Sequence, residues 1–153
     1  MQSDSKVKLA VIATGARSWT VVADLQRAGD QTEIVAVFDP DRERVAKRLK
    51  SWKSPDAQVC DTYQEAIQRE DVDWVMVFSP NAYHREHIIC ALEAGKHVFT
   101  EKPLATSIDD CQAIYEAHQK TDRLFATGFV LRYAPLYRKT KELLDQGFIG
   151  RIL

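Results

Sequence analysis

The sequence predicts an α/β protein with a doubly wound, mostly parallel sheet in a single domain. Short apolar runs alternate along the chain with segments of helical period, which is the order expected of successive strand and helix units. Several runs are apolar at consecutive positions, as strands covered by helices on both faces require. Crossovers between parallel strands are right-handed. Such sheets bind ligands at the carboxyl ends of their strands, so functional residues are sought there.

Six segments are predicted to be strands, each a short apolar run followed by turn or helix signals. The third of them is weak, because only two or three residues fit the pattern. The predicted strands are Val7–Ile12, Glu33–Phe38, Gln58–Cys60, Trp74–Phe78, His97–Thr100 and Leu124–Val130.

Helices are predicted between the strands from their end signals and apolar stripes. Two pairs fit the S/T-x-x-E/D capping pattern, and two glycines stand where helices would end; these residues are Thr62 with Glu65, Ser107 with Asp110, Gly95 and Gly147. The later helices are expected at about Tyr83–Ala94, Ser107–Lys120 and Pro135–Gln146. In each of the last two, the apolar positions fall on one stripe of the helix. They are Ile108, Cys111, Ile114, Tyr115 and His118 in the first, and Leu136, Leu143 and Leu144 in the second.

The composition is that of a globular chain without the excess of positive charge that attracts nucleic acid. The 153 residues are 45% apolar and carry a formal net charge of -1, with basic residues interspersed among acids. We therefore predict no nucleic-acid partner. The N-terminus is polar, and no apolar stretch approaches the ~18 residues needed to span a bilayer. These features predict a cytoplasmic protein that does not enter a membrane.

The cysteines and two histidines are weak candidates for metal or disulfide chemistry. Cys60, Cys90 and Cys111 are widely spaced, with no C-x-x-C pair, and are expected to be small buried hydrophobes. His84 and His87 are three positions apart on a predicted helix, a spacing that suits a metal. Because no carboxylate or thiolate partner is implied nearby, no metal site is predicted.

The loop after the first strand is the first candidate site. Residues 13–18, with the sequence ATGARS, stand where a G-x-G-x-x-G phosphate loop would join a strand to a helix. Gly15 keeps the middle position, where a missing side chain lets backbone N–H groups approach a pyrophosphate. Ala13 replaces the first glycine and is expected to keep a negative φ, while Ser18 replaces the third and is a candidate helix cap. Trp19 would flank a bound cofactor. An ordinary turn with one glycine is the alternative.

The second strand ends at an acidic residue, Asp39, which lies 21 positions after Ser18. An acid about 20 residues beyond the loop hydrogen-bonds the ribose 2′-hydroxyl in dinucleotide-binding domains, and its charge would repel a 2′-phosphate. NAD is therefore favoured over NADP. Asp39 followed by Pro40 also fits a helix N-cap with proline at the first helical position. Arg42 and Arg44 would soften the exclusion of NADP, or are solvated charges on a helix surface.

Motifs at the later strand ends make the interpretation specific. The chain carries SPNAYH after the fourth strand, AGKHVFTEKPLA around the fifth, and GFVLRYAPLYRKTKELLDQGFIGRIL to its end. Together with IATGARS and FDPDRERV, these motifs resemble the Gfo/Idh/MocA family of NAD(P)-dependent oxidoreductases over nearly the whole chain. The resemblance implies a Rossmann fold. It also implies hydride transfer between a nicotinamide and the carbinol or carbonyl carbon of a sugar, polyol or related small molecule.

The resemblance also implies roles for individual residues. Lys102 of the E-K-P motif would be the catalytic residue, lying beside the nicotinamide and the substrate hydroxyl, and Glu101 would position the nicotinamide ribose. Pro103 would fix the exit from the fifth strand. Arg132 matches an arginine at the active-site side of the sixth strand. The implied cofactor-binding residues are Ala13, Thr14, Gly15, Ala16, Arg17, Asp39, Ser79, Pro80, Asn81, His84, Glu101, Lys102 and Arg132.

Members of that family continue into a second domain that carries the substrate pocket, for which 153 residues leave no room. We expect one NAD(P)-binding domain over residues 1–153, with a polar tail at 1–6 and the start of the connection to the absent domain at 147–153. The chain is expected to bind NAD without full catalysis, and an exposed cleft face would favour weak self-association. Two alternatives are a non-catalytic NAD(P)-sensing module and a doubly wound domain that has lost nucleotide binding.

Overall fold

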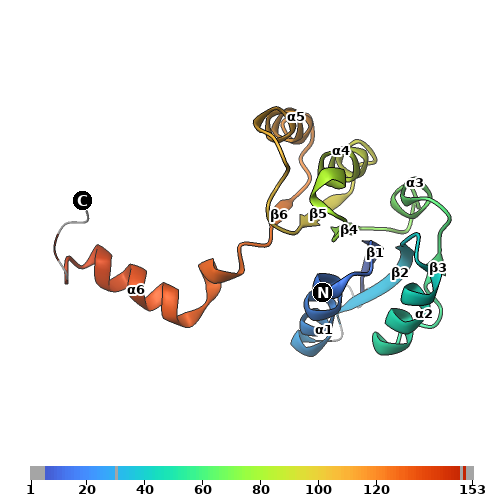
Figure 1. The fold of residues 1–153 in the computed structure, drawn as a ribbon, viewed down its shortest axis with the longest axis horizontal. Helices are drawn as coiled ribbons and strands as arrows, with labels where there is room; N and C mark the ends of the chain where they lie inside the picture. The colour runs from blue at the N-terminus through green and yellow to red at the C-terminus, as the bar shows by residue number, and fades with distance from the viewer. Residues whose placement is uncertain (1–5, 30, 149, 151–153) are drawn as a thin grey trace, which may run out of the picture.

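The computed structural model describes residues 6–29, 31–148 and 150. Its six strands form one parallel sheet in the order β3-β2-β1-β4-β5-β6, with helices on both faces (Figure 1). The predicted doubly wound fold is confirmed. The strands are β1 (Val7–Ile12), β2 (Thr32–Phe38), β3 (Gln58–Val59), β4 (Trp74–Val77), β5 (His97–Thr100) and β6 (Phe125–Thr127).

The register brings the strand ends into line. Ile12 of β1 is aligned with Phe38 of β2 on one side and with Val77 of β4 on the other. Val77 is in turn aligned with Thr100 of β5. The loops that follow these four strands therefore begin at a single edge of the sheet. The strand order reverses between β1 and β4, and open α/β sheets bind ligands in the crevice at this switch point.

Six helices and two short 3₁₀ turns lie between the strands or after the last of them in the described chain. They are α1 (Ala16–Ala28), α2 (Arg42–Ser51), α3 (Tyr63–Ile67), η1 (Asn81–Tyr83), α4 (His84–Glu93), α5 (Ile108–His118), η2 (Val130–Tyr133) and α6 (Pro135–Asp145). The predicted end signals are confirmed. The Thr62 and Ser107 side chains cap α3 and α5, and Gly95 and Gly147 follow α4 and α6 with positive φ. That conformation satisfies the last carbonyls of a helix at little cost for glycine.

The core lies in two layers, one on each face of the sheet. Alternate residues of β1 point to opposite faces, so Ala10 and Ile12 belong to one cluster, and Leu9 and Val11 to the other. The first cluster includes buried residues of α3, α4 and α5, and the second includes buried residues of α1 and α2. Figure 1 shows the same division, with α1 and α2 on one side of the sheet and α3, α4 and α5 on the other.

Two predicted apolar stripes are less buried than expected. In α5 only Ile114 is fully buried, whereas Ile108 is 83% exposed and Tyr115 is 58% exposed. No side chain of α6 is buried, and Leu136 is 73% exposed. For α6 the reason is the course of the chain, since this helix projects away from the sheet and meets neither face of it (Figure 1).

Two smaller expectations also differ from the structure. The sixth strand ends at Thr127 because the chain turns into η2, so Val130 is not in the sheet. Cys60 is buried, but Cys90 and Cys111 are only partly buried on helices at the surface of the fold. Burial raises the pKa of the Cys60 and Cys90 thiols.

The predicted terminal segments fall largely outside the described residues. These are 1–5 of the polar tail and 149 and 151–153 of the connection. Within the described part of the chain, no helix combines the length and the apolar character needed to cross a bilayer.

The cap of α5 gives a stability test. The Ser107 hydroxyl oxygen accepts a hydrogen bond from the Asp110 backbone N–H at 3.0 Å. Ser107→Ala leaves that donor without its partner, so the free energy of unfolding should fall by about 1 kcal/mol, whereas Ser107→Asp keeps an acceptor and should change it by only a few tenths. Urea denaturation of the three proteins measures the difference. Equal stability of wild type and Ser107→Ala would contradict the assigned cap.

Candidate cofactor site

The candidate residues from the sequence gather at the carboxyl edge of the sheet. The loop of residues 13–15 follows β1, Asp39 follows β2, Ser79 follows β4, and Glu101 follows β5. They come from segments far apart in the chain, and the parallel sheet brings them to one side. This edge contains the switch point between β1 and β4, so the expected location of the site agrees with the fold.

The phosphate-loop candidate has an open approach at Gly15. A Cβ built at Gly15 would meet no atom within 4 Å, so the backbone there faces free space. Gly15 is the N-cap of α1, no side chain caps this helix, and its first turn holds no acidic residue. The N–H groups and the positive dipole end of the helix are therefore available to an anion. Ser18 is not the cap, because its hydroxyl donates to the Gly15 carbonyl at 2.7 Å.

Ala13 differs from the expectation for the first glycine position. Its φ is +69°, in the left-handed region, rather than negative. The Ala13 N–H still continues the sheet by donating to the Phe38 carbonyl at 2.7 Å, and the chain must then turn sharply into the loop. Glycine adopts this conformation without the steric cost that a Cβ carries. The loop thus keeps the backbone shape of the glycine fingerprint with an alanine in it.

Asp39 ties this loop to the end of β2. Its Oδ2 atom accepts hydrogen bonds from the Thr14 backbone N–H at 2.7 Å and from the Thr14 hydroxyl at 2.9 Å, and its Oδ1 atom accepts from the Asp41 N–H at 2.8 Å. Asp39 is only 3% exposed and Thr14 is fully buried. The Thr14 side chain is therefore an anchor of the loop. The N-cap alternative for Asp39 is wrong, because Asp41 caps α2 by accepting from the Arg44 N–H.

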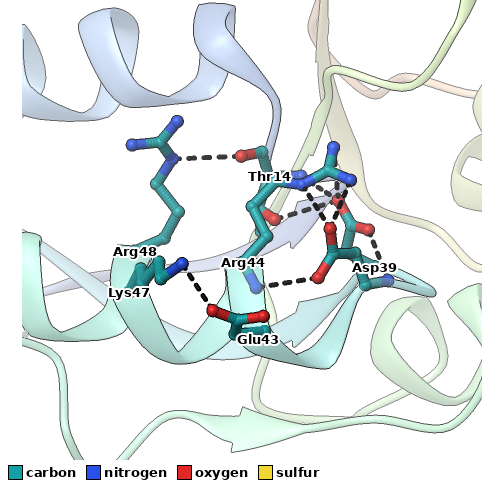
Figure 2. Close-up of polar contacts among 7 residues, drawn as sticks. Thr14, Asp39, Glu43, Arg44, Lys47 and Arg48 are labelled. Atoms are coloured by element: carbon teal, nitrogen blue, oxygen red, sulfur yellow. Dashed lines mark hydrogen bonds and ion pairs between the residues drawn. The ribbon is translucent and has the colours of Figure 1, made fainter.

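Helix α2 contributes two arginines to the same edge. Arg48 donates from Nε to the Thr14 carbonyl at 3.0 Å (Figure 2). Its guanidinium lies 4.9 Å from the centre of the Trp19 ring. Arg44 binds Asp41 and comes within 4.0 Å of the Asp39 carboxylate. Hydrogen bonds from Arg44 hold the pKa of Asp41 below its ordinary value. Arg48 was not predicted from the sequence, since one arginine among several on a helix surface carries no distinguishing signal.

The turn after β4 is pinned by two buried histidines. His84 is fully buried, with ring nitrogens 2.9 Å from the Ser79 carbonyl oxygen and 2.9 Å from that of Pro103. His87 lies 2.9 Å from the Ser79 hydroxyl and packs on the Tyr63 ring. His84 thus holds the backbone of this edge, and His87 holds the Ser79 side chain. Pro80 and Asn81 are exposed at its surface.

The E-K-P segment combines a buried acid with an exposed base. Glu101 is 5% exposed and forms an ion pair with Arg17 of α1, with 2.7 Å between Nη2 and Oε1. Lys102 is exposed, and the peptide bond between it and Pro103 is cis. Lys102 and Arg132 both line a groove of about 1010 Å³ whose other walls come from residues 128–131 and from α6. The structure therefore brings the two cationic candidates to one cavity.

Among the described residues, no group of three or more His, Cys, Asp or Glu side chains is arranged to hold a metal ion. The residues fit a dinucleotide instead. The open N-terminus of α1 at Gly15 suits a pyrophosphate, and the carboxylate of Asp39 suits a ribose hydroxyl. Asp39 accepts three hydrogen bonds in the chain, which leaves lone-pair capacity for a further donor.

Ala13→Gly tests the backbone of the loop. Removing the Cβ relieves a left-handed conformation that costs about 1–2 kcal/mol, and the greater freedom of glycine in the unfolded chain returns about 0.4–1 kcal/mol. We expect the free energy of unfolding to stay the same or rise by up to about 1.6 kcal/mol. Ala10→Gly, at a fully buried β1 position without positive φ, is the matched control and should destabilise. Equal losses in the two variants would contradict the loop geometry.

His87 gives a test of pH dependence. Burial lowers the pKa of His87 from 6.5 to about 4. Between these values the unfolded chain binds a proton at His87 and the folded chain does not, so the free energy of unfolding falls as the pH decreases. From about pH 7 to about pH 4.5 the wild type should therefore lose more stability than His87→Asn, which does not titrate there. Denaturant melts of both proteins across this range measure the difference, and parallel curves would contradict the assignment.

Comparison with known proteins identifies the family to which the chain belongs. A model of the oxidoreductase family with the NAD-binding Rossmann fold, Gfo/Idh/MocA, matches residues 7–129. An inositol 2-dehydrogenase of Gluconacetobacter diazotrophicus is 40% identical over 146 residues, which are 95% of this chain and 43% of that protein. An inositol 2-dehydrogenase of Saccharopolyspora erythraea is 41% identical over 145 residues, 94% of this chain and 42% of that protein. The chain thus spans less than half the length of these relatives.

Solved structures agree in fold and differ in the cofactor they hold. The myo-inositol dehydrogenase of Lactobacillus casei, in complex with NAD(H) and myo-inositol, is 33% identical, with a TM-score of 0.88 over 97% of this chain and 44% of that one. The 3-ketoreductase KijD10 of Actinomadura kijaniata, as a mutant in complex with NADP, is 28% identical, with a TM-score of 0.84 over 97% of this chain and 45% of that one. The chain belongs to the Gfo/Idh/MocA family of oxidoreductases and has that family's NAD-binding Rossmann fold.

Proposed function

We propose that this chain binds NAD at the carboxyl edge of its sheet and forms the cofactor half of a dehydrogenase that acts on a polyol or sugar. The observation that carries the proposal is the pairing of an open helix N-terminus at Gly15 with the buried carboxylate of Asp39. The first suits the pyrophosphate of a dinucleotide and the second suits its adenosine ribose.

The loop is held ready for the cofactor by contacts within the chain. Thr14 is bound on one side by Asp39 and on the other by Arg48, through its backbone N–H, its hydroxyl and its carbonyl. A loop already fixed in shape loses little conformational entropy when a ligand binds. The bound pyrophosphate would then rest on the free N–H groups of the first turn of α1.

The nicotinamide end of the cofactor would lie toward Glu101 and Lys102. A bound NAD supplies the hydride acceptor, and the protein orients it. The ammonium of Lys102 would hold or move the proton of a substrate hydroxyl at that end. Several relatives are named for inositol, a polyol, and this favours a polyol or sugar as the substrate class. Because Lys102 and Arg132 face an open groove, we expect the 153-residue chain to bind NAD without sustained turnover.

Titration calorimetry with NAD tests the proposal. Asp39→Asn removes the charged acceptor for the ribose, so the affinity for NAD should fall about 10-fold, as expected for the loss of a hydrogen bond to a charged group. Thr14→Val is the matched control, since it removes the Thr14 hydroxyl from Asp39 but leaves the carboxylate in place. Its loss of affinity should be smaller.

Two outcomes would count against the proposal. Wild type that shows neither heat nor thermal stabilisation with NAD or NADP would overturn nucleotide binding as a whole. Equal losses of affinity in Asp39→Asn and Thr14→Val, together with lower melting temperatures, would mean that Asp39 only anchors the loop.

A further inference from the structure

Next to Asp39, at the start of α2, an aspartate and an arginine form a local pair. Arg44 donates to Asp41 Oδ2 from Nε at 3.1 Å and from Nη2 at 2.7 Å, so two donors of one guanidinium meet a single carboxylate oxygen. The third nitrogen of the group, Nη1, lies 4.0 Å from Asp39 Oδ2. Figure 2 shows this guanidinium beside Asp39. The pair therefore lies at the end of β2, where the proposed ribose would bind.

The other cations of α2 near this edge are engaged elsewhere. Arg42 donates to the Cys60 carbonyl and pairs with Asp61. Lys47 pairs with Glu43, and Arg48 donates to Thr14. Arg44 is 44% exposed in its side chain and reaches the Asp39 carboxylate, so it is the cation of this helix that a group on the ribose would meet.

A 2′-phosphate differs from a 2′-hydroxyl in charge and in what it needs from the protein. It carries up to two negative charges and is bound best by the fork of donors on an arginine. Asp41 disfavours the binding of a 2′-phosphate in two ways. Its carboxylate occupies the guanidinium donors of Arg44, and it adds a negative charge beside that of Asp39. Neither effect weakens the binding of a ribose 2′-hydroxyl, which is uncharged and needs only one hydrogen-bond acceptor.

We propose that Asp41, by holding the guanidinium of Arg44, sets the preference for NAD over NADP, and that Arg44 is a latent 2′-phosphate site. The inference rests on the proposed binding of NAD and adds to it a discriminating residue other than Asp39. Neutralising Asp41 would release the Arg44 fork and remove one of the two negative charges. Asp39 keeps its charge, so NAD should remain bound.

Asp41→Asn is the variant that separates this role from folding. The asparagine side-chain oxygen can still accept from the Arg44 backbone N–H and so keep the cap of α2, since Asn and Asp are about equal at an N-cap. Its NH₂ group is a donor and cannot accept from a guanidinium. The matched control is Glu43→Gln, which removes one negative charge from the same turn of the helix but releases Lys47 instead of Arg44.

The test is titration of the 153-residue chain with NAD and NADP at low salt, and with the fragments 5′-AMP and 2′,5′-ADP. Asp41→Asn should bind NADP and 2′,5′-ADP about 10-fold more tightly than wild type, with much smaller changes for NAD and 5′-AMP. Glu43→Gln should leave all four affinities nearly unchanged. Asp41→Asn combined with Arg44→Gln should lose the gain, which would assign it to the guanidinium.

The outcomes separate this inference from the proposed function. If wild type binds NAD but Asp41→Asn does not gain affinity for NADP, the inference is wrong and NAD binding stands. If Glu43→Gln gains as much as Asp41→Asn, or if the double variant keeps the gain, general charge near the helix is responsible and the inference is again wrong. If wild type binds none of the four nucleotides, both proposals fail.

Discussion

The buried carboxylate of Asp39 is the group on which the geometry of the candidate cofactor site depends. It accepts two hydrogen bonds from Thr14 and one from the Asp41 N–H, so the loop after β1 and the turn after β2 are joined through one anion. A charge this far from water is costly unless hydrogen bonds replace its hydration, and here three donors do so. The loop shape and the charge at the end of β2 are therefore fixed together.

The helices differ in whether a side chain of the chain itself accepts hydrogen bonds from the N–H groups at their N-termini. Helices α2, α3 and α5 are each capped by a side chain of the chain itself and carry an acidic residue in the first turn. Helices α1 and α6 have neither, and of these two it is α1 that begins beside the switch point of the sheet. Four N–H groups at a helix start need acceptors, so those of α1 are left to solvent or to a ligand. The missing cap of α1 is informative because this helix begins at the switch point, directly after Gly15.

Sequence patterns were sufficient for the fold and for the positions of most candidate residues. Apolar runs predicted the strands, and the Thr62 and Ser107 caps were confirmed, because both signals depend only on local spacing. The positive φ of Ala13 was not predicted, since alanine gives no sign of a left-handed turn imposed by its neighbours.

Contacts between residues far apart in the chain were also not predicted from the sequence. Arg48 holds a loop 34 residues away in the chain, and Asp41 rather than Asp39 caps α2, because Asp39 is drawn to Thr14 by the packing of β1 against β2. The stripe of α6 predicted burial that the course of the chain does not provide. Periodicity describes one face of a helix, and the direction of the preceding turn decides whether that face meets a partner.

The position of Lys102 is set by its neighbours. Gly128, after β6, packs against Glu101 so closely that a Cβ there would lie 3.1 Å from Glu101 Oε1 and 3.2 Å from the Phe99 ring. Glu101 in turn holds Arg17 in the first turn of α1. The start of α1 and the E-K-P segment are thus connected through one ion pair across the switch point. Glu101 is held by the close packing of Gly128 and by the ion pair with Arg17, and Lys102 is the next residue in the chain. A fixed neighbour of this kind is what the proposed role of Lys102 toward a substrate would need.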